Sequence, residues 1–176
     1  MSIGRTESVA LLGLSGSVVE IEVDIADGLP GFSLLGLPDA ALSESRDRVR
    51  AALTNCSEAW PNKKVTVSLS PAWLPKSGSS FDLSIALAML IAQQTLPQAP
   101  FQQTTILGEL ALDGKIRAVR GVLPALIAAY KAGIRRAIVP TANRAEAQLM
   151  SAMEVLTFAT LHRDSVANIL REQFRK

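Results

Sequence analysis

Two adjacent serines, Ser79 and Ser80, have the best setting for chemistry, because they directly precede an apolar run at residues 81–93 that predicts a helix. Amides at the start of a helix can stabilise an oxyanion, which suits a serine nucleophile. A serine also needs a base, and a lysine serves as one only when burial keeps it neutral. Lys76 lies in a polar loop and nothing in the sequence links the single histidine, His162, to the serines. Helix capping is therefore the favoured interpretation.

Phosphate and metal chemistry have no matching pattern. A Walker A loop requires Gly-x-x-x-x-Gly-Lys followed by Ser or Thr, and the sequence has no such segment. One cysteine, Cys56, and one histidine are too few for a disulfide framework or a zinc site. We expect neither ATP binding by that route nor a metal site in this chain.

Alternating apolar and polar residues predict the strands. Residues 18–26 alternate with a period of two, which is typical of a half-buried strand, and residues 9–14, 32–37 and 64–70 read as further strands. We expect a turn at Ser15-Gly16-Ser17 and a hairpin at Asp113-Gly114, a preferred two-residue turn. Shorter strands are expected at residues 137–140 and 154–158.

Helical periodicity begins after Asp39, which can act as an N-cap. A single helix is predicted to run to about Asn55, with Glu44 and Arg48 spaced as a favourable surface pair. Further helices are expected at residues 122–132, 143–150 and 165–174. The mixed order of helices and strands favours one α+β domain over residues 1–176.

Composition limits the function classes. The 176 residues are 48% hydrophobic with a net charge of +2, so intrinsic disorder is excluded and a surface that binds nucleic acid by charge alone is disfavoured. No apolar run approaches the roughly 20 residues that a membrane span needs. The N-terminus lacks the pattern of a signal peptide, so we expect a cytoplasmic protein with no membrane partner.

Three segments carry a family resemblance. The chain resembles the ComM/YifB family of Mg-chelatase-like AAA+ ATPases in Gly36-Leu37-Pro38-Asp39-Ala40-Ala41 with Glu44-Ser45-Arg46-Asp47-Arg48-Val49-Arg50, in Pro75-Lys76-x-Gly78-x-x-Phe81-Asp82-Leu83, and in Gly108-Glu109-Leu110-Ala111-Leu112-Asp113-Gly114. The resemblance implies a Lon-protease-like domain, also described as the ribosomal protein S5 domain 2-like fold. It also implies that this domain precedes an AAA+ module, which would bind ATP and magnesium.

The similarity to Lon places Ser80 at the position of Lon's nucleophile. It also places Leu123 where Lon carries the lysine base. A leucine cannot accept a proton, so the resemblance implies a shared fold without peptidase activity. Ser80 would then be a relic position.

The resemblance implies a non-catalytic domain of a hexameric ATPase that acts on DNA as a branch-migration helicase in natural transformation. Its role would be assembly or the placement of single-stranded or branched DNA. The candidate contact residues are Arg46, Arg48 and Arg50, with Lys76 and Arg120 near the relic site. Three alternatives stay open: a solvated helix face for the three arginines, a serine peptidase using Ser80, and a pure oligomerisation module.

Overall fold

A long antiparallel hairpin forms the middle of the sheet. In the computed structural model, which describes residues 2–174, β1 (Ser2–Leu12) pairs with β2 (Ser15–Ala26) from end to end. The alternation predicted for β2 is confirmed, since its odd-numbered residues from Val19 onwards are buried. The predicted turn at residues 15–17 is wrong. The chain reverses at Gly13-Leu14, where Gly13 has φ +63°, and the two serines belong to the strand.

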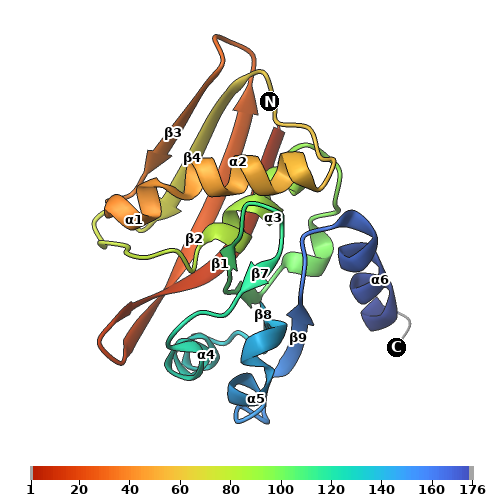
Figure 1. Ribbon diagram of the computed structural model, residues 1–176. Coiled ribbons are helices and arrows are strands. Elements are labelled where there is room, and N and C mark those ends of the chain that lie inside the picture. The colour runs from red at the N-terminus through yellow and green to blue at the C-terminus, as the bar shows by residue number, and fades with distance from the viewer. Residues whose placement is uncertain (1, 175–176) are drawn as a thin grey trace.

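Seven strands make up the main sheet (Figure 1). Their spatial order is β3-β4-β2-β1-β5-β8-β9. Their bounds, besides those of the hairpin, are β3 Gly31–Leu35, β4 Lys64–Ser70, β5 Thr104–Ile106, β8 Arg136–Pro140 and β9 Glu154–Phe158. The β1–β2 and β2–β4 pairs are antiparallel, and the remaining neighbours are parallel. The mixed sheet confirms the α+β fold class.

The Asp113-Gly114 hairpin is confirmed, although its loop is longer than two residues. It joins a separate small pair of strands, β6 (Glu109–Leu110) and β7 (Ile116–Arg117). Gly114 adopts φ +90°, a left-handed conformation that favours glycine.

The helices differ from expectation in two places. Their bounds are α1 Ala40–Ser43, α2 Ser45–Asn55, α3 Asp82–Ala92, α4 Val122–Lys131, α5 Arg144–Ala147 and α6 Arg163–Phe174, with 3₁₀ turns η1 Ala99–Phe101 and η2 Thr141–Asn143. The helix predicted from Asp39 to Asn55 divides at Glu44, although Asp39 does cap α1 through the Leu42 amide at 2.8 Å. The helix predicted at residues 143–150 shortens to η2 and α5.

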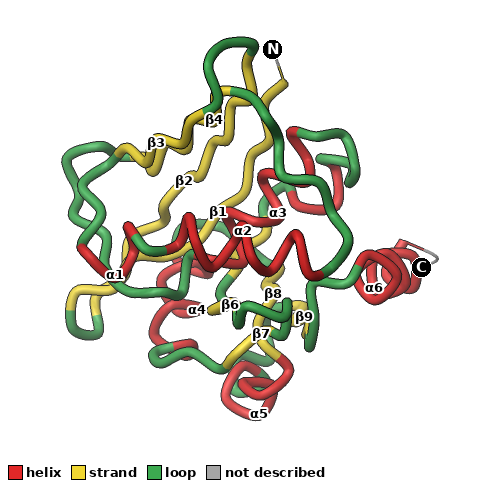
Figure 2. Tube along the Cα trace, turned by 45° about the horizontal axis from the view of Figure 1, so that its top comes forward, coloured by secondary structure: helices red, strands yellow, loops and turns green. Residues whose placement is uncertain are grey.

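Helices cover the two faces of the sheet unequally (Figures 1 and 2). One face packs against α3, which approaches so closely that a Cβ on Gly4 would lie 2.8 Å from the Ala92 amide nitrogen. Every residue of α3 is buried, and α2 packs over it. On the opposite face, α4 covers only the hairpin end, where a Cβ on Gly16 would lie 2.5 Å from Ala128 Cβ. On the same side α5 packs against β8 and β9, and the face is open at β2, where Glu20 is exposed.

Among residues 2–174, no helix combines the length and the apolar character that crossing a membrane requires.

Candidate functional site

Ser80 lies in a cleft of about 410 Å³, which we call the Ser80 cleft. Its walls come from β1, the segment before α3, β6 and the start of α4, and its lining residues are Val9, Leu11, Ser77, Gly78, Ser79, Ser80, Leu107, Glu109, Ala118, Val119, Arg120, Gly121 and Ala125. The structure therefore brings Ser80 and Arg120 together, as predicted. His162 is exposed and lies outside the cleft.

The serines do not cap α3. Phe81 occupies the N-cap position, and no side chain makes a capping hydrogen bond there, so the capping prediction is wrong. The Ser79 hydroxyl donates instead to the Glu109 carboxylate. Within residues 2–174 the Ser80 hydroxyl makes no hydrogen bond.

Leu123, which stands at the lysine position of the Lon-like pattern, lies in the first turn of α4. It is half-buried and is not one of the residues that line the Ser80 cleft. Its amide donates to Glu146 at 2.9 Å. Arg120 is exposed at the rim of the cleft, immediately before Gly121, which adopts φ +78° at the N-cap of α4.

Lys76 is not a surface contact, and this part of the prediction is wrong. The residue is only 1% exposed, and its ammonium donates to the carbonyls of Gly36 and Leu69, each at 2.8 Å, and to that of Pro71. Burial lowers the pKa of the Lys76 ammonium. This cation ties the end of β3 to the end of β4, so it serves the fold and is unavailable to an external partner.

Arg48 also points into the protein. Its guanidinium donates to both carboxylate oxygens of Asp82, at 2.7 and 3.0 Å, and Asp82 is fully buried at the start of α3. Burial raises the pKa of Asp82, whereas Arg48 and the amide of Leu110 act to lower it. The predicted surface pair with Glu44 is present at 3.4 Å. The Arg48–Asp82 pair thus joins α2 to α3 and, through Asp82, to β6, and the inward geometry of Arg48 does not suit a contact with DNA.

Arg46 and Arg50 lie on the exposed side of α2 and each covers an aromatic ring. The Arg46 guanidinium carbon is 6.0 Å from the Phe32 ring centroid, and that of Arg50 is 5.7 Å from the Trp60 centroid. The two rings stack on each other at 5.9 Å. We call these four residues the arginine–aromatic platform. It combines exposed cations with half-buried rings.

The sequence pattern did not predict Phe32, Trp60 and Asp82 as partners of the arginines. An i, i+4 spacing of Arg46 and Arg50 on one helix face was a usable signal for the platform. No local pattern links Arg48 to Asp82, which lie 34 residues apart. Within residues 2–174 no three His, Cys, Asp or Glu side chains gather closely enough to hold a metal ion.

Comparisons with known proteins agree with this fold. The family model described as subunit ChlI of Mg-chelatase matches residues 21–143. A protein of Mycobacterium tuberculosis is 54% identical over 161 residues, which cover 92% of this chain and 32% of that protein. The competence protein ComM of Haemophilus influenzae is 44% identical over 86% of this chain and 30% of its own length, and YifB of Escherichia coli is 40% identical with the same coverage.

The chain belongs to the ComM/YifB family, with its Mg-chelatase ChlI-type domain. It spans about a third of the length of the curated relatives that it matches. Lon protease of Mycolicibacterium smegmatis is 24% identical over 163 residues, which cover 86% of this chain and 21% of Lon. This match identifies the domain as Lon-like, as expected from the sequence.

Proposed function

We propose that this domain is a non-catalytic N-terminal part of a hexameric AAA+ ATPase that migrates DNA branches, and that it places single-stranded or branched DNA for that motor. Family membership supports this role, and the name of the Haemophilus influenzae relative associates that protein with competence. ATP and magnesium would be bound by the ATPase module, and the motor activity would reside there as well.

The arginine–aromatic platform carries the proposal. Proteins bind single-stranded nucleic acid without sequence preference by combining cations that contact phosphates with aromatic rings on which bases stack. Arg46 and Arg50 offer exposed guanidinium groups, whose central carbons lie 6.0 and 5.7 Å from the centroids of the half-buried Phe32 and Trp60 rings. Bases can stack on guanidinium planes as well as on the exposed parts of aromatic rings. A net charge of only +2 fits binding by a local platform better than binding by overall charge.

Fluorescence anisotropy with a labelled oligothymidine tests the platform. We expect Arg46→Ala/Arg50→Ala to weaken binding by about tenfold or more and to flatten the salt dependence, because each lost phosphate contact on single strands reduces the slope by about 0.7. Lys131→Ala/Arg171→Ala removes the same charge from exposed positions on α4 and α6 and is the matched control. Equal losses of oligothymidine affinity in the two double variants would refute DNA binding by the platform.

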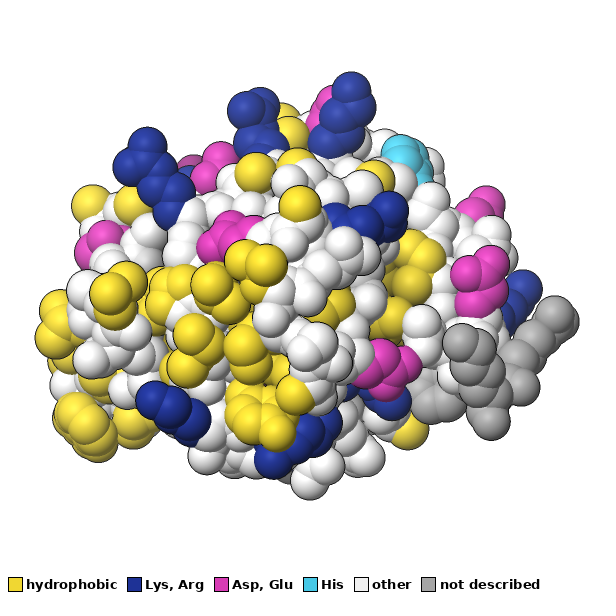
Figure 3. All heavy atoms as spheres, turned by 90° about the horizontal axis from the view of Figure 1, so that it is seen from below, with side chains coloured by type: hydrophobic (Ala, Val, Ile, Leu, Met, Phe, Trp, Pro, Cys, Tyr) yellow, Lys and Arg dark blue, Asp and Glu magenta, His cyan; other side chains and the backbone are white. Residues whose placement is uncertain are grey.

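A second role in assembly is supported by an apolar surface at the hairpin end of the molecule, where yellow side chains gather in Figure 3. At this end Leu12 and Leu14 of the hairpin tip are 87% and 84% exposed, and Ile127 on α4 is also exposed. Exposed apolar patches mark interaction surfaces.

Sedimentation equilibrium measures that assembly. If this surface joins copies, Leu12→Ser/Leu14→Ser should weaken self-association about tenfold or more. Leu29→Ser, at a 90% exposed site in the β2–β3 loop, should leave it unchanged. A wild-type chain that stays monomeric up to high concentration would contradict the assembly role.

The peptidase alternative rests on Ser80, whose hydroxyl is unpartnered among the described residues and borders the Ser80 cleft. A fluorophosphonate probe distinguishes the two functions. Stoichiometric labelling that is lost in Ser80→Ala but kept in Ser77→Ala would establish a nucleophile and overturn the non-catalytic proposal. We expect the probe to label neither the unmodified chain nor its two serine variants.

A further inference from the structure

Two glutamates face each other on the open face of the sheet. The β1–β2 register places Glu7 directly opposite Glu20, and it places Arg5 opposite Glu22 on the same face. That face is opposite to the one packed on α3, because neighbouring residues such as Thr6 point towards that helix and donate to the Ser84 carbonyl. Like charges directly opposite each other in a sheet are destabilising. The β1–β2 pairing alone therefore does not account for two glutamates at directly opposed positions.

The local cations do not neutralise this pair. Arg5 is engaged by Glu22 at 3.2 Å, and neither Glu7 nor Glu20 forms an ion pair within residues 2–174. One carboxylate oxygen of Glu7, Oε2, is buried without a hydrogen-bond partner among the described residues. Burial, and after it the charge of Glu20, raises the pKa of Glu7.

A second buried polar group beside Glu7 also lacks a partner. Thr105 is 0% exposed, and its hydroxyl makes no hydrogen bond within the described part of the chain. It is paired with Glu7 across the β1–β5 contact, so both side chains point to the same face of the sheet. Buried polar groups in folded proteins normally have partners, so an unsatisfied hydroxyl next to an unsatisfied carboxylate indicates a ligand position.

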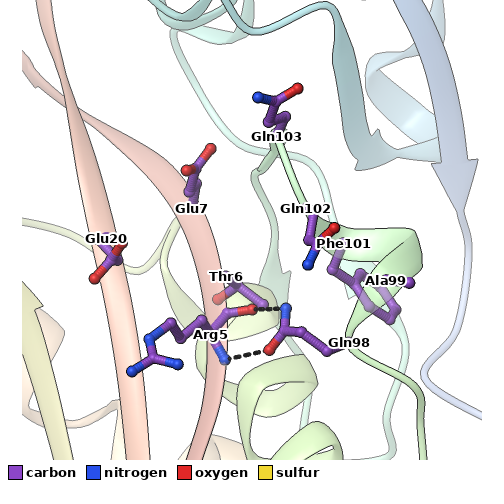
Figure 4. Close-up of a pocket in the computed structure, with 9 residues that line it drawn as sticks. All are labelled: Arg5, Thr6, Glu7, Glu20, Gln98, Ala99, Phe101, Gln102 and Gln103. Atoms are coloured by element: carbon purple, nitrogen blue, oxygen red, sulfur yellow. Dashed lines mark hydrogen bonds between the residues drawn. The ribbon is translucent and has the colours of Figure 1, made fainter.

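Glu7 and Glu20 line a cleft of about 620 Å³, which we call the Glu7 cleft (Figure 4), whereas the fully buried Thr105 is not one of its lining residues. Figure 4 shows Glu7 and Glu20 on adjacent strands along one side and the segment from Gln98 to Gln103 along the other. Gln98 fixes this second side, because its amide accepts from the Arg5 amide at 2.9 Å and donates to the Arg5 carbonyl at 2.7 Å. Gln102 and Gln103 are exposed and bring further amide groups to the rim.

We propose that the Glu7 cleft is a docking site for an arginine side chain of a partner protein, held between the carboxylates of Glu7 and Glu20. The cleft is larger than a bare metal ion requires. A guanidinium carries five N–H donors in a planar fork, which suits carboxylates on two neighbouring strands together with amide oxygens at the rim. Nucleic acid is the wrong occupant, because its phosphates would be repelled by the two carboxylates.

Binding of a short arginine peptide to the whole chain tests this site. The probe is acetyl-(Gly-Arg)₄-amide, compared with the (Gly-Lys)₄ and (Gly-Glu)₄ peptides and followed by ¹H–¹⁵N chemical shifts and titration. We expect the arginine peptide to shift the amides of Glu7, Thr105 and Gln102. We also expect it to bind more tightly than the lysine peptide, and the glutamate peptide not to bind.

Two double variants decide whether the cleft is the site. Glu7→Gln/Glu20→Gln should weaken binding of the arginine peptide by about tenfold or more, because two charge-assisted hydrogen bonds are lost. The variant should fold, because it removes a repulsion. Asp47→Asn/Glu172→Gln makes the same charge change at exposed positions on α2 and α6 and should keep wild-type affinity. Unchanged binding by the cleft variant, an equal loss in the control, or equal binding of the lysine peptide would overturn the proposal.

Discussion

Arg48 and Asp82 form a two-point ion pair between α2 and the first turn of α3, with N–O distances of 2.7 and 3.0 Å. The carboxylate is fully buried, and it also accepts from the Leu110 amide at 3.1 Å. This pair fixes β6, which contributes Glu109 to the Ser80 cleft, relative to both helices. An arginine in a family motif therefore has a role inside the fold.

Breaking this pair should be costly. Arg48→Met leaves a buried carboxylate without its cation, and we expect the free energy of unfolding to fall by about 3 kcal/mol. Arg48→Met/Asp82→Leu should lose much less than the sum of the two single variants, since it leaves no orphaned charge. Urea denaturation of Arg48→Met, Asp82→Leu and the double variant measures the free energy of unfolding of each. Glu44→Ala, which removes the exposed partner of Arg48, should lower the free energy of unfolding by under about 0.5 kcal/mol. If the losses of Arg48→Met and Asp82→Leu simply added in the double variant, Arg48 and Asp82 would not be coupled.

Glu7 should make stability depend on pH. Its pKa is raised above 4.5 in the folded protein by burial and by Glu20, so the protonated form stabilises the fold. That contribution is complete below about pH 4.5 and is lost as pH rises through the raised pKa. Glu7→Gln mimics the protonated form, so it should raise Tm at neutral pH, with a gain that shrinks towards pH 4.5.

Circular dichroism melts across this pH range measure the effect. Glu20 and Thr105 face Glu7 from the adjoining strands and Arg5 lies beside it on β1, and all three stay the same in the variant. Glu172→Gln on the exposed face of α6 controls for the loss of one negative charge. A gain that is constant with pH would argue against titration of Glu7.

The Lys76 ammonium should be required for the stability of the fold. Lys76→Met leaves the carbonyls of Gly36, Leu69 and Pro71 without their donor, and we expect a loss of about 2 to 4 kcal/mol in the free energy of unfolding. Lys63→Met, at an exposed position in the loop before β4, should change it by under about 0.5 kcal/mol. Chemical denaturation of the two variants gives the comparison, and equal small losses would show that the buried ammonium is dispensable.

Gly4 should tolerate no side chain. A Cβ there would lie 2.8 Å from the Ala92 amide nitrogen and closer still to the Ala88 carbonyl oxygen, so Gly4→Ala must push α3 off the sheet. We expect a loss of about 3 kcal/mol or failure to fold. Gly31→Ala in β3 is the control, because its nearest neighbour would be at 3.9 Å. A stable, folded Gly4→Ala protein would mean that α3 can move away from β1.

Local patterns predicted the elements well but could not place them. The alternation in β2 identified its buried face, because successive strand residues point to opposite sides. Capping by Asp39 was also predictable, since it depends on residues three positions apart. The helix division at Glu44 and the longer hairpin loop at Gly114 depend on how neighbouring segments pack, and no periodicity carries that information.

The candidate site was harder to predict for the same reason. Ser80 and Arg120 come together only because the segment before α3 and the segment before α4 line one cleft. A lysine in a proline-rich loop reads as exposed, and its burial became visible only once the loop was seen to fold over the ends of two strands. The arginines of α2 divide into inward and outward groups according to which face of the helix they occupy.

The two hydrogen bonds between the Gln98 side chain and the Arg5 backbone have a consequence for the solubility of the folded chain. β5 reaches β1 only at Glu7, so the backbone of Arg5 would otherwise present an unpaired donor and acceptor at a strand edge. Such an edge is a template on which another chain can add a strand and begin to aggregate. The glutamine amide occupies that template with the same donor and acceptor pattern. The Gln98 side chain thus prevents another chain from adding a strand at this edge of β1.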